Sequence, residues 1–502
     1  MGKASLPGPA EGCGPLAKAY LLACDLAGCE AKRLLFESLA AADLAQQQNP
    51  KRGVKIECIG SRPEGFLQRL AEPDLELLLQ AASCCSAKIV LLNLAFNWLG
   101  SGAAAVFGAQ LLLLQPLQQL VLAGNCIEEA AAANLCQQLL LLPRLSYLDL
   151  SFNQLKRKGG EAAAALLQNS KTLKTLKLRN TQLDLHALVH ITTALQQSNR
   201  SLETLDISDV DVSFNSMHAY HLAGVVQLAS NLLHLDLGRQ ALRDDGVEIL
   251  YPFLRQNKTL RSLGLAANEI SWRGGLFLGR LLSASPPLQF LDLNFNKLGD
   301  WGASCIAAGI ESNDLLLVLL LRGNAISSKG LARIREALAL NSTLEAVGLA
   351  GNLWTEAYLR EFTQARPHFR RSEPLAVDLE LNAAGRLQTD RSLPFYRHQQ
   401  SATTGVCSPA APATAAEAAA AAAARGVETD DEIAAQETET EIEAAAAAVD
   451  AEAAAATAEA AAAKTGTAAA ATQVTEAVAG TETAAAAKTE EAAKLQSQTL
   501  NF

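Results

Sequence analysis

The segment Leu145–Leu155 reads LSYLDLSFNQL, and Leu288–Leu298 repeats the same order of apolar and polar residues as LQFLDLNFNKL. Both follow the pattern L-x-x-L-x-L-x-x-N-x-L, which occurs ten times between residues 89 and 354. The copies begin at Ile89, Leu117, Leu145, Leu173, Leu202, Leu232, Leu260, Leu288, Leu316 and Leu344. Seven of the nine steps between them are 28 residues long, one is 29 and one is 30. Such a regular period predicts one structural unit stacked many times.

Each copy predicts a short strand, a turn and a helix. The first, fourth and sixth positions (Leu145, Leu148 and Leu150 in the third copy) place apolar side chains inward. The ninth position turns the chain, because an asparagine amide can satisfy backbone groups that leave the strand ladder. Asparagine stands there at Asn97, Asn125, Asn153, Asn268, Asn296, Asn324 and Asn352, whereas Val210 and Gln240 replace it. One unit cannot bury both of its faces, so the units stack into a curved solenoid.

The pattern resembles the leucine-rich-repeat family, and its 28-residue step is similar to the ribonuclease-inhibitor-like class of that family. The resemblance covers about half of the chain. It implies an α/β fold, namely a leucine-rich-repeat horseshoe of about ten 28-residue repeats with parallel strands on the concave side and helices on the convex side. An N-terminal helical segment, these repeats and a short C-terminal strand pair together are similar to the leucine-rich-repeat-containing protein 34 family.

The regions outside the repeats predict two caps and a tail. The expected organisation is a disordered N-terminus (1–16), a helical N-terminal cap (17–88), the solenoid (89–366), a C-terminal cap (367–400) and a disordered acidic tail (401–502). Within the caps, Lys55–Ile59 predicts a strand, Leu75–Ala82 a helix, and residues 375–387 a hairpin. The tail contains 42 alanines in 102 residues, and it cannot bury enough apolar surface to offset the entropy of ordering.

Charge and cysteine content exclude several classes of protein. The net charge is −10, and the tail accounts for it: residues 401–502 hold 16 acidic and 4 basic residues (net −12), which leaves +2 for the remainder. Without a basic surplus, nucleic acid is not an expected partner. No apolar run reaches membrane-spanning length, and no apolar signal segment opens the chain. The ten cysteines are too sparse for a disulfide scaffold, so we expect a cytoplasmic or nuclear protein that is not secreted.

Two local motifs favour structural interpretations. His186 and His190 lie at i and i+4, the spacing of a helical metal pair, but the glutamate of a metalloprotease helix is absent between them. Ordinary histidines on the convex side are therefore the favoured interpretation, and no metal or other cofactor is expected. The asparagines of three N-x-S/T sequons (Asn199, Asn257 and Asn341) each lie three residues before the next strand's first leucine. A position set by the repeat predicts a structural role rather than glycosylation.

The concave side holds the candidate partner-binding residues. The fifth position of each copy lies between two inward leucines and is expected to point outward. It is acidic in the middle copies, and aromatic residues stand nearby in the third and eighth copies. Charges beside exposed aromatic rings are typical of protein interfaces. The predicted partner-binding residues are Tyr147, Asp149, Phe152, Asp206, Asp209, Asp236, Phe290, Asp292 and Phe295, with Lys177, Arg239 and Arg322 interrupting the acidic set. For any single aspartate the favoured interpretation is a residue that keeps the strand edge soluble, whereas the set as a whole favours a binding surface.

The predicted function is non-enzymatic: a scaffold that holds a protein partner, with a basic patch of its own, on the concave face. No phosphate-binding loop, dinucleotide motif or nucleophile elbow occurs, so neither catalysis nor a small-molecule substrate is expected. The alternative is a GTPase-activating protein for a small Ran-like GTPase, since a leucine-rich horseshoe followed by an acidic tail is similar to that family. The tail here is alanine-rich rather than densely acidic, and no N-terminal loop arginine matches that family.

Overall fold

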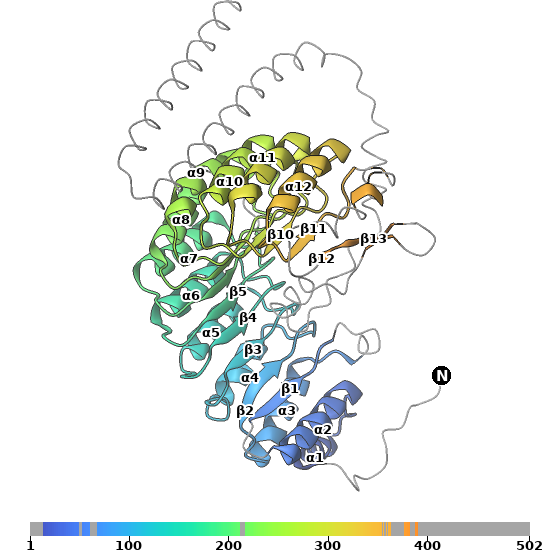
Figure 1. Cartoon of the computed structure of the whole chain (residues 1–502). Helices are drawn as coiled ribbons and strands as arrows, with labels where there is room; N and C mark the ends of the chain where they lie inside the picture. Colours follow the sequence, from blue (N-terminus) through green and yellow to red (C-terminus); the bar gives the residue numbers. More distant parts are fainter. Residues whose placement is uncertain are drawn as a thin grey trace, which may run out of the picture. The chain divides into compact units, whose positions relative to one another are not determined.

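The structure is a computed structural model, and it describes residues 14–49, 53–60, 68–210, 216–353, 355, 358, 360–362, 376–381 and 387–389. Helices and strands alternate along most of this length (Figure 1). The helices are α1 (Pro15–Ala27), α2 (Arg33–Gln48), α3 (Glu72–Cys84), α4 (Ala103–Ala109), α5 (Glu129–Leu139), α6 (Lys156–Asn169), α7 (Leu185–Gln197), α8 (Ser216–Leu228), α9 (Arg243–Gln256), α10 (Trp272–Ser283), α11 (Gly299–Ser312) and α12 (Ser328–Leu340). None of the helices within the described ranges is long and apolar enough to cross a membrane.

The strands are short, and most hold three residues. They are β1 (Val54–Glu57), β2 (Ile89–Asn93), β3 (Gln119–Val121), β4 (Tyr147–Asp149), β5 (Thr175–Lys177), β6 (Thr204–Asp206), β7 (His234–Asp236), β8 (Ser262–Gly264), β9 (Phe290–Asp292), β10 (Val318–Leu320), β11 (Ala346–Gly348), β12 (Ala376–Val377), β13 (Leu379–Leu381) and β14 (Leu387–Thr389). Each strand from β3 to β11 coincides with the third to fifth positions of one sequence repeat, and β2 covers the first to fifth positions of its own, which confirms the predicted register.

The chain divides into two compact units, each built from the same strand-and-helix repeat. The first unit contains the described residues up to Glu269 together with 287–295, and the second contains 270–286 and the described residues from 296 onward. In the first unit β1 to β9 pair in parallel, each with the next strand in chain order. In the second unit β10, β11 and β12 pair in parallel in the same way. Figure 1 shows the helices of the first unit on one side of its strands.

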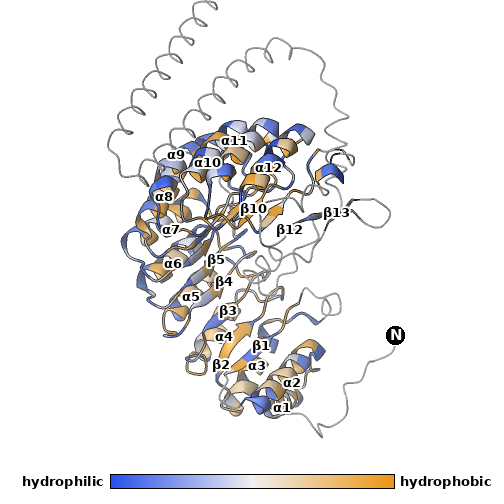
Figure 2. Ribbon diagram, in the orientation of Figure 1, coloured by the Kyte–Doolittle hydropathy of each residue, from blue (hydrophilic) through white to orange (hydrophobic). Residues whose placement is uncertain are grey.

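Columns of leucine form the core of each unit. Leu145, Leu148 and Leu150 are buried, as are the equivalent residues of the neighbouring repeats. The pairing Leu120–Leu148–Leu176 places identical side chains side by side on successive strands. Figure 2 shows the strands mostly in the hydrophobic colour and the helices in both colours, as expected for helices with one buried side. The predicted α/β solenoid is therefore confirmed.

The ninth-position asparagines hydrogen-bond one repeat to the next. Asn153 is buried, and its Nδ2 donates to the backbone oxygens of Leu122 and Leu150 at 2.9 Å each. Its Oδ1 accepts from the backbone N–H of Ile127 at 3.2 Å. Thr181 takes the same position one repeat later, and its hydroxyl donates to the oxygen of Leu178 at 2.6 Å. These side chains satisfy backbone groups that the three-residue strands leave unpaired.

A second set of asparagines ends the helices, and it includes all three sequon asparagines. Nδ2 of Asn199 donates to the oxygen of Leu167 in the preceding repeat, while its Oδ1 accepts from the backbone N–H groups of Ser201 and Leu202. Asn257, Asn313 and Asn341 make the same contacts in their repeats. Asn313 is not part of a sequon, so the repeat itself explains these residues, as the sequence analysis predicts.

The N-terminal cap differs from the prediction in detail. The helical cap predicted over 17–88 begins with two separate helices, α1 and α2, because Gly28 ends α1 in the left-handed conformation with φ +67°. The predicted strand is found as β1, and it pairs in parallel with β2. It therefore extends the repeat sheet of the first unit, and α3 covers the predicted Leu75–Ala82 helix.

The C-terminal cap is described only in part. The predicted hairpin is found as β13 and β14, paired antiparallel, whereas Ala376 and Val377 join the parallel sheet through β11. Between them Asp378 is fully buried and forms an ion pair with Arg322, which the sequence places among the residues that interrupt the acidic set. The predicted disorder of 401–502 and of most of 1–16 lies outside the described residues.

Candidate protein-binding surface

The candidate residues lie in the first unit, on the face of its sheet opposite the helices, which we call the strand face. The residues at the fifth position of the repeats that contain β4 to β9 are in register, so that they form one row across these six strands. The row runs in the order Asp149, Lys177, Asp206, Asp236, Gly264 and Asp292. Phe290 and Tyr147 lie two residues earlier on the outermost strands of this set.

The carboxylates of the row stabilise the turn that follows each strand. Oδ1 of Asp149 accepts from the N–H of Ser151 at 3.0 Å, and Oδ1 of Asp206 accepts from the N–H of Ser208 at 3.0 Å. Asp236 and Asp292 make the same bond, at 2.9 Å, to the residue two positions later. Each of these four aspartates thus has a structural role in its own repeat, whether or not it also binds a partner.

Asp149 and Lys177 are buried, although the alternation of the strand predicts that they are open to solvent. Their exposed fractions are 3% and 4%. Burial raises the pKa of Asp149, and the ammonium group of Lys177 opposes that shift. Burial lowers the pKa of Lys177, whereas the negative charges of Asp149, Asp206 and Asp236 raise it. No described residue offers Nζ of Lys177 a hydrogen bond, and this atom lies 5.6 Å from the centroid of the Tyr147 ring.

The middle of the row is acidic and half-buried. Asp206 and Asp236 are direct neighbours across β6 and β7. Burial, together with the adjacent Asp206 carboxylate, raises the pKa of Asp236 to about 7. A cation brought next to this pair would relieve the repulsion between two carboxylates. Asp209 lies beside them but is engaged, since Oδ2 accepts from Asn180 at 2.8 Å and pairs with Arg239 at 3.5 Å.

Aromatic side chains occupy the turn after the strands in an unusual backbone conformation. The eighth position has a positive φ in every repeat, and glycine stands there at Gly124, Gly323 and Gly351. Phe152 and Phe295 adopt this left-handed conformation with φ values of +58° and +59°. For an L-residue that conformation costs about 1 kcal/mol or more. Phe295 nevertheless presents its ring to solvent, with an exposed fraction of 62%.

A model of the Leucine Rich repeat family matches residues 143–162 and 284–307, which contain β4 and β9 with the turns and first helical residues after them. Pig (Sus scrofa) ribonuclease inhibitor is 27% identical over 299 residues, which are 59% of this chain and 65% of the inhibitor. This chain has a leucine-rich-repeat fold, and its sequence is similar to that of a ribonuclease inhibitor.

Other similar leucine-rich-repeat proteins are much longer than the matched stretch. Leucine-rich repeat-containing protein 45 from Gallus gallus is 32% identical over 136 residues, 27% of this chain and 20% of that protein. Protein CARMIL from Dictyostelium discoideum is 29% identical over 202 residues, 40% of this chain and 19% of that protein. The match thus spans about a fifth of these two relatives.

Phe96 and Arg179 also lie at the aromatic end of the strand face, although neither is among the predicted partner-binding residues. Phe96 shares the left-handed eighth position (φ +59°), and the centroid of its ring lies 6.3 Å from that of Phe152. Phe96 and Tyr147 together cover a small buried cluster of apolar residues. The guanidinium of Arg179 lies 5.8 Å from the Phe152 ring centroid. The repeat position of Phe96 could have revealed it, because it is the same as that of Phe152 and Phe295.

Proposed function

We propose that this leucine-rich-repeat protein is a non-enzymatic scaffold that binds a protein partner on the strand face of its first unit. The observation that supports this most directly is the aromatic eighth position. Phe96, Phe152 and Phe295 stand where the backbone favours glycine, and Phe295 gains little burial in return. Backbone strain without a packing benefit is typical of residues kept for binding. Exposed aromatic rings are also the usual anchors of protein interfaces.

The polar part of the strand face defines the chemistry of the partner. Half-buried carboxylates at Asp206, Asp236 and Asp292 lie between the aromatic residues near β4 and those near β9. A lysine or arginine of the partner placed there would be held by two or more carboxylates and would offset their mutual repulsion. The same carboxylates would repel phosphate groups. The partner we propose is therefore a protein with a basic patch flanked by apolar residues, and not a nucleic acid.

Phe295→Gly is expected to reduce partner capture by about 30-fold while the chain stays folded. Removing a central aromatic anchor costs roughly 2 kcal/mol of binding free energy, which corresponds to that factor. Stability should not fall, because glycine adopts the left-handed conformation freely and the ring is mostly exposed. The measurement is affinity purification from cells of the source organism with quantitative mass spectrometry, and thermal melting of both chains.

Tyr220→Ala is the matched control, since Tyr220 is 61% exposed but lies on α8 in the helix layer. Its capture profile should equal that of the parent chain. If the Tyr220 variant but not the Phe295 variant lost partner capture, the binding surface would lie on the helices and not on the strand face. If the captured protein is a small GTPase whose single-turnover GTP hydrolysis this chain accelerates, the protein is an activator of that GTPase and the scaffold proposal is wrong.

A further inference from the structure

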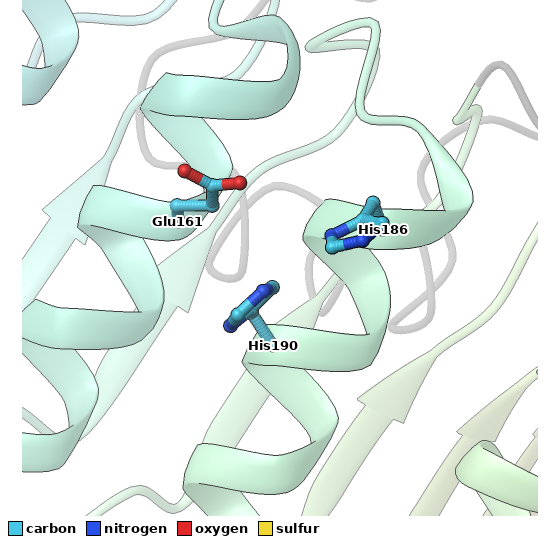
Figure 3. Close-up of side chains that lie close together, drawn as sticks. All are labelled: Glu161, His186 and His190. Atoms are coloured by element: carbon cyan, nitrogen blue, oxygen red, sulfur yellow. The ribbon is translucent and has the colours of Figure 1, made fainter.

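A cluster of potential metal ligands lies in the helix layer of the first unit, away from the strand face. Glu161 is on α6, and His186 and His190 are on the next helix, α7. One carboxylate oxygen and one imidazole nitrogen of each histidine all lie within 4.8 Å of one another. Figure 3 shows the carboxylate of Glu161 on the side of α6 that faces the two imidazoles. The structure therefore supplies the acidic ligand that α7 lacks.

The two helices hold these side chains in place for simple geometric reasons. His186 and His190 are four residues apart on α7, so they project from the same side of the helix, and their ring centroids are 5.3 Å apart. Glu161 lies 25 residues earlier, and stacking of successive repeats brings α6 alongside α7. Nothing in the sequence close to the two histidines indicates this third ligand. This explains why the histidine pair alone does not predict a metal site.

The surrounding charges leave the three side chains available. Asp184 caps the N-terminus of α7, where its Oδ1 accepts from Ala187, and its Oδ2 forms an ion pair with Arg157 at 2.6 Å. It is thereby committed to the helix end. Among the described residues, none forms a hydrogen bond or ion pair with the side chain of Glu161, His186 or His190. Both histidines are exposed, and Glu161 is half-buried.

We propose that Glu161, His186 and His190 bind a Zn²⁺ ion that links α6 to α7. Two imidazoles and one carboxylate form a known type of zinc ligand set, with water in the fourth position. Tetrahedral bonds of about 2.0–2.1 Å require ligand atoms about 3.4 Å apart, so the side chains must close by roughly 1 Å, which exposed rotamers do readily. Mg²⁺ and Ca²⁺ prefer oxygen ligands and are excluded by the imidazoles. Linking neighbouring repeats would stabilise the first unit.

The test is calorimetric titration of Zn²⁺ into the full, metal-stripped chain without a histidine tag. One ion should bind per chain. His190→Gln and Glu161→Gln should each raise the dissociation constant at least 10-fold. His221→Gln is the matched control, because His221 lies on α8 outside the cluster, and its affinity should equal that of the parent chain. Zn²⁺ should also raise the melting temperature of the parent chain by a few degrees but not that of His190→Gln, and Mg²⁺ should have no effect.

Exposed thiols are the competing ligands for Zn²⁺, and the experiment distinguishes them from the proposed site. Cys29, Cys84 and Cys126 are exposed and reduced, and thiolates bind Zn²⁺ well. Co²⁺ bound at the proposed site should show no thiolate-to-metal charge-transfer absorption. A dissociation constant equal in the parent chain and in His190→Gln, or such an absorption band, would overturn the proposal. So would the absence of binding at millimolar Zn²⁺.

Discussion

Leu291→Asp is expected to abolish cooperative folding of the repeats around β9. Leu291 is fully buried in the leucine column, directly paired with Leu263 on the neighbouring strand. The substitution removes the packing of a leucine, which alone costs about 2–5 kcal/mol, and places a carboxyl group where no partner can satisfy it. A total loss of about 5 kcal/mol or more exceeds what a few repeats of a solenoid can tolerate, because each repeat is stabilised only by its neighbours.

Thermal melting and amide hydrogen exchange over residues 232–295 measure this effect. Gln289→Asp is the matched control: it adds the same charge two residues away at an exposed position, and it should change stability by less than about 0.5 kcal/mol. If Leu291→Asp melts like the parent chain, the leucine columns are not the core and the repeat register is wrong.

Asn153→Leu is expected to destabilise the first unit by about 3 kcal/mol or more. The substitution keeps side-chain volume but leaves the backbone N–H of Ile127 and the oxygen of Leu150 without the partners that Asn153 provides. Each unsatisfied buried group costs about 1–3 kcal/mol. Asn153→Thr should recover part of the loss, since a threonine at the equivalent position, Thr181, donates to its own repeat's backbone oxygen.

Urea-induced unfolding of the three chains measures these differences. The predicted order of stability is parent, then Asn153→Thr, then Asn153→Leu. Equal stability of the threonine and leucine variants would show that the hydrogen bonds of this side chain contribute nothing, and that the asparagine is kept for another reason.

The repeat pattern predicts most of the fold because every repeat meets the same neighbours. Leu148, Asn153 and Asn199 each have the role expected from their position, since contacts between adjacent repeats recur every 28 to 30 residues. A pattern of this kind needs no long-range information. For the same reason it predicts one strand in each repeat and the structural role of the sequon asparagines.

Contacts specific to one place in the solenoid could not be predicted in this way. Burial of Lys177 depends on Tyr147 and Asp149 in the adjacent repeat, not on its own alternation. Glu161 meets the α7 histidines only because two helices stack. Arg322 pairs with Asp378, 56 residues away in the chain. Such pairings depend on which side chains face each other across repeats, and the repeat pattern alone does not reveal them.

The acidic centre of the strand face gives the most direct test of the proposed binding surface. At pH 8, where Asp236 with its pKa of about 7 is mostly ionised, Asp206→Asn with Asp236→Asn removes both negative charges but keeps the side-chain oxygens that accept from Ser208 and Gly238, so the turns should stay intact. Complementary charge speeds association, and salt screens it over a Debye length of about 8 Å at physiological ionic strength. The measurement is the association rate constant of the captured partner with both chains at low and high salt. Our account predicts slower association of the double variant and a weaker dependence on salt, with an unchanged melting temperature. Equal association rates of the two chains at both salt concentrations would contradict it.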